Sequence, residues 1–159
     1  MCAVLFGITQ AARAANLSYD YTTNPGWFTA DAWTNAVPED TDWTAGANAT
    51  IAANVAKTIN FTDSTTIGNL TITGNIGFAV TITDTEARTL TFNGGTLTTD
   101  TVLQIGGGVS LQGDYTKEGV GYIRLQGTTA DAYAGTATLN AGLFEIWAVE
   151  RVGASSNFV

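Results

Sequence analysis

The stretch at 115–135, YTKEGVGYIRLQGTTADAYAG, combines cationic side chains with closely spaced glycines, which are the residue types that cradle phosphate groups. It holds Lys117 and Arg124, two of the six cationic residues of the chain. The glycines follow neither the G-x-x-x-x-G-K-[ST] nor the G-x-G-x-x-G spacing, and no strand-then-helix pattern surrounds them. We therefore interpret the stretch as architectural, with glycines at tight corners or close backbone approaches and an alternating strand between them.

Paired carboxylates could support glycoside hydrolysis, which needs two of them about 5–10 Å apart. Asp114 and Glu118 form the best-placed pair, but they flank an expected turn, where a solvated charge is the simpler interpretation. The acids Glu39, Asp40 and Asp42 do not have the spacing of an EF-hand loop. The sequence therefore predicts no catalytic residue, no metal site and no cofactor.

Tryptophan side chains could serve binding instead, because an exposed indole face can stack on a sugar ring. Three of the four tryptophans, Trp27, Trp33 and Trp43, lie in one segment that also holds both prolines. The alternative is a structural cap, because the open end of a repeat fold must be covered. We favour the cap and keep these three residues as candidates for a glycan platform.

Composition narrows the function classes further. The chain has 159 residues, no histidine, a single cysteine (Cys2) and a net charge of −8. These counts exclude Ser-His-Asp catalysis and intrachain disulfides, and the acidic balance argues against a nucleic-acid partner. With 45% hydrophobic residues, 28 threonines and 18 glycines, the chain is typical of a folded β structure rich in turns.

Short alternating runs recur through the chain after residue 49, with apolar pairs about ten residues apart and threonines between them. Period-two alternation indicates half-buried strands, and even spacing with turn-rich connections is typical of a β-solenoid, although a sandwich or barrel also fits. The residues expected to point inward are Ile59, Phe61, Leu70, Ile72, Val80, Ile82, Leu90, Phe92, Ile123, Leu125 and Leu139.

The stretch at 115–143 resembles the autotransporter-associated β-strand repeat of bacterial surface proteins. The residues that carry the resemblance are Thr116, Lys117, Gly119, Gly121, Ile123, Leu125, Gly127, Tyr133, Gly135, Thr136, Thr138, Leu139, Asn140, Ala141, Gly142 and Leu143. Tyr115 stands where the family usually has leucine, and the segment between Gly127 and Tyr133 is longer than usual. The resemblance implies a right-handed parallel β-helix on a secreted or outer-membrane-anchored protein, without a catalytic residue.

The predicted organisation is a front-truncated signal peptide at 1–14, a cap or first rung at 15–48, and solenoid rungs at 49–159 that are uncapped or cut at the C-terminus. No segment is apolar over the length that a membrane helix needs. The expected function is a non-catalytic structural stalk or adhesion module outside the cell, with self or glycan as partner. The alternatives are a self-assembling extracellular fibre subunit and a polysaccharide-active β-helix enzyme.

Overall fold

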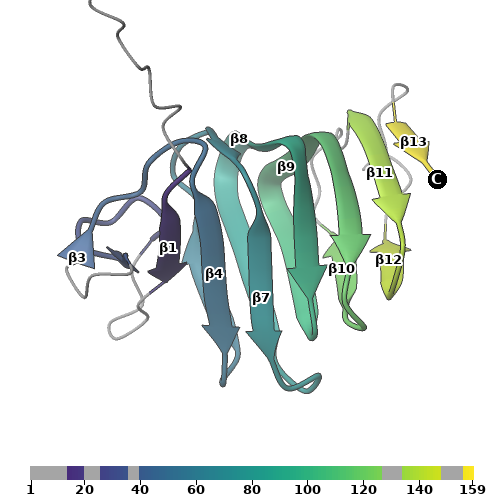
Figure 1. Ribbon diagram of the computed structural model, residues 1–159, viewed down its shortest axis with the longest axis horizontal. Helices are drawn as coiled ribbons and strands as arrows, with labels where there is room; N and C mark the ends of the chain where they lie inside the picture. The colour runs from purple at the N-terminus through teal and green to yellow at the C-terminus, as the bar shows by residue number, and fades with distance from the viewer. Residues whose placement is uncertain (1–13, 20–25, 36–39, 127–133, 148–155) are drawn as a thin grey trace, which may run out of the picture.

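The computed structural model describes residues 14–19, 26–35, 40–126, 134–147 and 156–159. Parallel coils stack into a β-solenoid of about four turns, and the described residues contain no helix (Figure 1). This confirms the predicted all-β parallel fold. The strands are β1 (Asn16–Tyr19), β2 (Trp33–Thr34), β3 (Asp40–Thr41), β4 (Asn48–Ala53), β5 (Lys57–Asn60), β6 (Thr65–Ile67), β7 (Leu70–Gly74), β8 (Ala79–Thr99), β9 (Val102–Glu118), β10 (Tyr122–Leu125), β11 (Gly135–Leu139), β12 (Leu143–Ile146) and β13 (Ser156–Phe158).

Each coil has three sides, and each side is a parallel ladder that runs from coil to coil. The first side contains β4, β7 and β11 with the ends of β8 and β9. The second contains β5, β10 and β12 with the starts of β8 and β9. The third contains β6 with the middles of β8 and β9. These two strands are long because each bends around the corners of a coil.

One coil takes about twice the interval seen in the sequence. On the second side Val80 pairs with Leu103, Leu103 with Ile123, and Ile123 with Phe144, at separations of 23, 20 and 21 residues. The ten-residue interval instead separates many residues that lie on successive sides of the solenoid. Residues ten apart therefore face the core from different directions, and residues about 21 apart stack directly.

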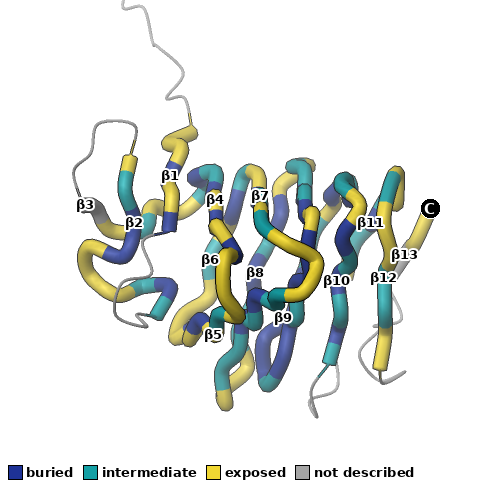
Figure 2. The backbone as a smooth tube through the Cα atoms, turned by 90° about the horizontal axis from the view of Figure 1, so that it is seen from below, coloured by how far each residue is buried: buried dark blue, intermediate teal, exposed yellow. Residues whose placement is uncertain are grey.

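The buried apolar residues form one core cluster inside the coils, and buried segments recur from coil to coil in Figure 2. Ten of the eleven residues expected to point inward are at most 2% exposed. Leu139 is the exception: its register with Lys117 continues an inward column, but the expected burial is wrong, because its side chain is 41% exposed, whereas Ala137 is buried. β13 pairs Phe158 with Ala137, and the backbone N–H of Leu139 donates to the carbonyl oxygen of Val159 at 2.8 Å.

Threonine stacks on threonine along the outer faces of the coils. Thr58 pairs with Thr81 on the second side, and on the first side Thr71 pairs with Thr98. A β-branched side chain fits the pleated surface, and cross-strand threonine pairs stabilise a sheet. The expected self-stacking of the polar strand positions is thus present.

An aromatic cap covers the N-terminal end of the solenoid. β1 pairs in parallel with β4, whereas the pairs β1–β2 and β2–β3 are antiparallel. Antiparallel strands interrupt the parallel ladder, so this end does not offer the next coil a matching template. The predicted signal peptide lies outside the described residues except for Ala14.

Candidate functional site

The glycine motif singled out in the sequence forms corners between stacked coils. Gly119 has φ of +79°, a conformation that residues with a Cβ rarely adopt. Gly121 is required for a different reason, since a Cβ there would lie 2.0 Å from the carbonyl oxygen of Thr101. Gly119, Gly135 and Gly142 combine both restrictions, because their φ values are +79°, +138° and +82° and an added Cβ would lie 2.4 Å or less from a backbone carbonyl oxygen of another coil. Gly127 and Tyr133 lie outside the described residues.

Lys117, the cation of this motif, is fully buried. It takes a place in an inner column of the first side that is otherwise apolar, formed by Leu17, Ala49, Leu70, Leu97, Lys117 and Leu139. Its Nζ donates hydrogen bonds to the carbonyl oxygens of Glu118 at 2.5 Å, Gly119 at 2.9 Å and Ala141 at 3.2 Å. The ammonium thereby pairs each of its three donors and joins two successive corners.

The electrostatics of Lys117 follow from this enclosure. Burial lowers the pKa of the Lys117 amine, and the carboxylates of Glu118 and Asp100 oppose the shift only in part. A Cβ on Gly142 would lie 2.8 Å from Nζ, so the glycine leaves room for the ammonium. An amine with no exposed surface cannot reach a substrate, and its chemistry here is to hold two coils together.

The two carboxylates considered for catalysis also join neighbouring coils. The Oδ1 atom of Asp114 accepts a hydrogen bond from the backbone N–H of Thr136 at 2.7 Å. The Oε1 atom of Glu118 accepts one from the side-chain amide of Asn140 at 2.8 Å. Each acid is thus engaged with the coil that follows. The described residues contain no group of three histidine, cysteine or acidic side chains that could hold a metal ion.

The tryptophans proposed as a glycan platform form the interior of the cap instead. Trp27 and Trp33 have no exposed surface, and Trp43 is half-buried. The ring centroid of Trp27 lies 4.8 Å from that of Trp33, 4.9 Å from Trp43 and 5.4 Å from Phe61. Buried rings offer no face to a sugar, so Trp27 and Trp33 are corrected to core residues.

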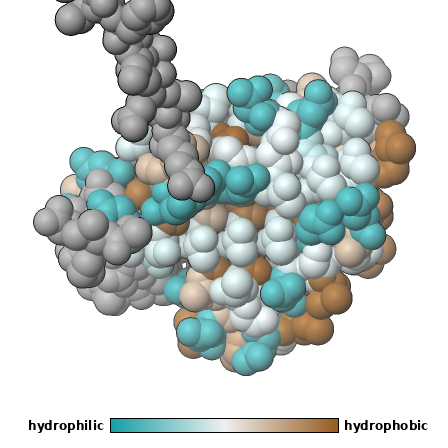
Figure 3. Space-filling view, in the orientation of Figure 1, coloured by the Kyte–Doolittle hydropathy of each residue, from teal (hydrophilic) through white to brown (hydrophobic). Residues whose placement is uncertain are grey.

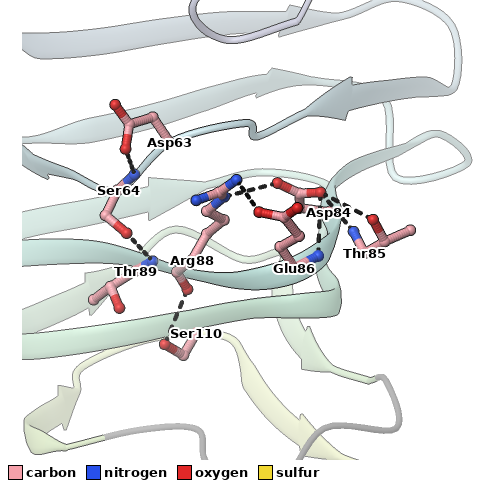
Figure 4. Close-up of polar contacts among 8 residues, drawn as sticks. All are labelled: Asp63, Ser64, Asp84, Thr85, Glu86, Arg88, Thr89 and Ser110. Carbon is pink, nitrogen blue, oxygen red and sulfur yellow. Dashed lines mark hydrogen bonds and ion pairs between the residues drawn. The ribbon is translucent and has the colours of Figure 1, made fainter.

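A polar corner not identified from the sequence surrounds Arg88 (Figure 4). Its guanidinium contacts Asp84 at 3.0 Å and Glu86 at 2.5 Å. Burial raises the pKa of Asp84, but the hydrogen bonds from Arg88 and from the N–H groups of Glu86 and Thr85 outweigh it and hold that pKa below its ordinary value. The arginine is thus paired with two carboxylates of its own corner rather than presenting a free charge, and the corner keeps a net negative charge.

An exposed aromatic cluster, also missed in the sequence, lies on the second side of the last coils. It consists of Tyr122, Arg124, Glu145 and Trp147, and we call it the Trp147 cluster. The guanidinium carbon of Arg124 lies 4.5 Å from the ring centroid of Trp147, and its Nε lies 2.5 Å from Glu145 Oε2. Trp147 is 60% exposed. The sequence signal that could have revealed this cluster is the spacing of 21 residues between Arg124 and Glu145. That spacing brings the two charges together only if the length of one coil is known.

Comparisons with known proteins give no indication of the function of the chain. No protein-family model, curated protein or solved structure matches the chain. Among the described residues, no helix has the length and apolar character to cross a membrane.

Proposed function

We propose that the chain is a non-catalytic structural β-solenoid module of a secreted or cell-surface protein, serving as a stalk or surface layer. The observation that carries this proposal is the use of polar side chains between coils. Hydrogen-bonded pairs one coil apart include Asn48–Asn69, Thr81–Gln104, Gln104–Gln126, Asp114–Thr136, Glu118–Asn140 and Arg124–Glu145.

Such pairs favour a structural role because carboxylates and other polar side chains, which an enzyme would direct at its substrate, are here hydrogen-bonded between coils. A general acid or nucleophile must reach the reacting atom, and its carboxylate needs a tuned pKa in a cleft. Here the candidate acids bond to the next coil. The resemblance to the autotransporter-associated β-strand repeat and the proposed signal peptide support the location outside the cell.

The enzyme alternative is tested with Asp114 and Glu118. Pectin and alginate incubated with the purified protein should release no new reducing ends and no unsaturated products. Asp114→Ala and Glu118→Ala should each lower the melting temperature, because a bond between coils is lost. Asp114→Asn, which keeps an acceptor oxygen, should lower it less.

Wild-type cleavage that disappears in Asp114→Asn or Glu118→Gln would replace the structural proposal with the enzyme. Surface location is tested separately. Protease added to intact cells that produce the whole protein should degrade it, and retention of the intact chain under those conditions argues against display.

A second candidate function is end-to-end assembly into a fibre. The exposed large apolar side chains of the last coil are Leu139, Leu143, Ile146, Trp147, Phe158 and Val159. Hydrophobic surface gathers at the C-terminal end in Figure 3. Of the described strands, only β10 pairs with β12. A strand edge with apolar residues can template pairing with another chain, in a contact that need not close.

If this assembly occurs, the sedimentation coefficient of the wild-type protein should rise with concentration. Ile146→Pro should abolish the rise, because proline removes a donor from the edge strand β12. Val120→Ala serves as a control, since Val120 is 73% exposed but lies outside the last coil. A sedimentation coefficient that does not change with concentration would exclude assembly of this chain.

A further inference from the structure

Trp147 is the one tryptophan of the chain whose ring is mostly exposed. It follows directly after β12, where the alternation of Phe144 inward and Glu145 outward continues. Its backbone N–H donates to the carbonyl of Leu125 at 3.1 Å, so the residue remains attached to the second side of the solenoid. A large aromatic ring on a rigid β face is pre-organised for stacking, because little conformational entropy is lost on binding.

The Trp147 cluster fixes the ring in position. Arg124 lies over one ring face, and its Nη2 donates to the hydroxyl oxygen of Tyr122 at 3.4 Å. Hydrogen bonds from Arg124 and from the Trp147 side chain hold the pKa of Glu145 below its ordinary value, although partial burial acts in the opposite direction. Arg124 thus lies over one face of the indole, and Trp147 remains 60% exposed.

The charges of the cluster select against ionic ligands. Arg124 and Glu145 compensate each other at 2.5 Å, so the ring lies beside a neutral pair. The whole chain carries a charge of −8, which repels an anionic polymer. The cluster instead offers a carboxylate, a guanidinium and a phenol that hydrogen-bond hydroxyl groups, beside an apolar ring. This combination matches a neutral sugar, whose ring has an apolar C–H face and a hydroxyl rim.

A column of equivalent positions leads away from Trp147 along the solenoid axis, with polar side chains at Asn60, Thr83 and Gln126 and a buried glycine, Gly106, between the last two. Register and backbone hydrogen bonds place Asn60, Thr83, Gly106, Gln126 and Trp147 at equivalent positions of successive coils. We call this column the axial strip. At its far end is a hollow of about 310 Å³ lined by Asn60, Thr62, Thr83, Asp84 and Thr85. Coils repeat about every 4.7–4.9 Å, a distance comparable to the length of one sugar unit.

We propose that the axial strip binds a linear neutral polysaccharide, with one pyranose ring stacked on the exposed indole of Trp147 and further units hydrogen-bonded toward the hollow at Thr83. This proposal names a ligand for the structural module proposed above and rests on it. The strip binds without cleaving, because the carboxylate in its hollow, Asp84, is ion-paired with Arg88 at 3.0 Å and accepts hydrogen bonds from Thr85 and Glu86.

The test is native affinity electrophoresis of the full chain in gels that contain hydroxyethylcellulose, xyloglucan or alginate. Hydroxyethylcellulose or xyloglucan should retard the wild-type protein, and the anionic alginate should not. Trp147→Ala should weaken retardation roughly tenfold or more, as expected for loss of an aromatic stacking contact. Trp147→Phe should retain much of it. Val120→Ala is the matched control for loss of an exposed apolar side chain and should behave as the wild type.

The proposal is overturned if neither neutral polymer retards the wild-type protein, or if Trp147→Ala is retarded as strongly as the wild type. It is also overturned if Trp147→Ala changes only self-association in sedimentation, since the cluster would then contact another protein chain. Circular dichroism of each variant shows whether the fold is retained. Release of sugar products would contradict the structural function while leaving binding intact, so the two proposals fail by different results.

Discussion

Replacing Gly121 with valine is expected to lower the free energy of unfolding by roughly 3 kcal/mol or more, because the added side chain has no room between two coils. A Cβ at this position would lie 2.0 Å from the carbonyl oxygen of Thr101 and 2.5 Å from its nitrogen. Both are backbone atoms, so no side chain can rotate away. The same carbonyl accepts the hydrogen bond of Tyr122 N–H at 2.9 Å, and separation of the coils would break it.

Urea unfolding followed by circular dichroism measures this loss, and Gly77→Val is the matched control. A Cβ on Gly77 has nothing within 4 Å, and its φ is not in the left-handed region. The control should therefore change stability by less than about 0.5 kcal/mol. Equal stability of the two variants would show that the coils at Gly121 are not packed as closely as described.

The fold class could be predicted because a short stretch of sequence already shows which side chains point into the core. Side chains alternate with period two, and a Val-Thr-Ile-Thr run such as 80–83 shows which residues point inward. The coil length could not be predicted in the same way, because it depends on which side pairs with which. Ile72 and Ile82 look like one repeat in the sequence, yet Ile72 pairs with Ile51 and Ile82 with Ile59.

The candidate site was only partly predictable. The glycines of the motif were expected at corners. An added Cβ would meet the backbone of another coil at both Gly119 and Gly121, and Gly119 also has a left-handed φ. The burial of Lys117 was not predicted. Two of its carbonyl partners, Glu118 and Gly119, lie in its own corner, and the third, Ala141, lies one coil away. The positions of the tryptophans are plain from the sequence, but whether each side chain is buried or exposed is not. The clustered Trp27 and Trp33 are core residues, whereas the isolated Trp147 is exposed.

Trp33→Ala is expected to reduce the free energy of unfolding by about 3–5 kcal/mol, the range for deleting a large buried aromatic side chain. The ring has no exposed surface, and its centroid lies 5.0 Å from that of Tyr19, 4.8 Å from Trp27 and 4.9 Å from Trp43. Its Nε1 donates to the carbonyl oxygen of Trp27 at 2.8 Å. The substitution would leave both a cavity and an unpaired buried acceptor in the cap.

Trp147→Ala is the control for this prediction, since it deletes the same side chain from an exposed position and should cost less than about 1 kcal/mol. The two variants should also separate stability from binding. Below its unfolding transition, Trp33→Ala should be retarded by neutral polysaccharide like the wild type, because a buried ring cannot stack on a sugar. Trp147→Ala should show the opposite pattern, with near-normal stability and weakened retardation. Loss of retardation in a folded Trp33→Ala protein would instead return the glycan platform to the N-terminal cap.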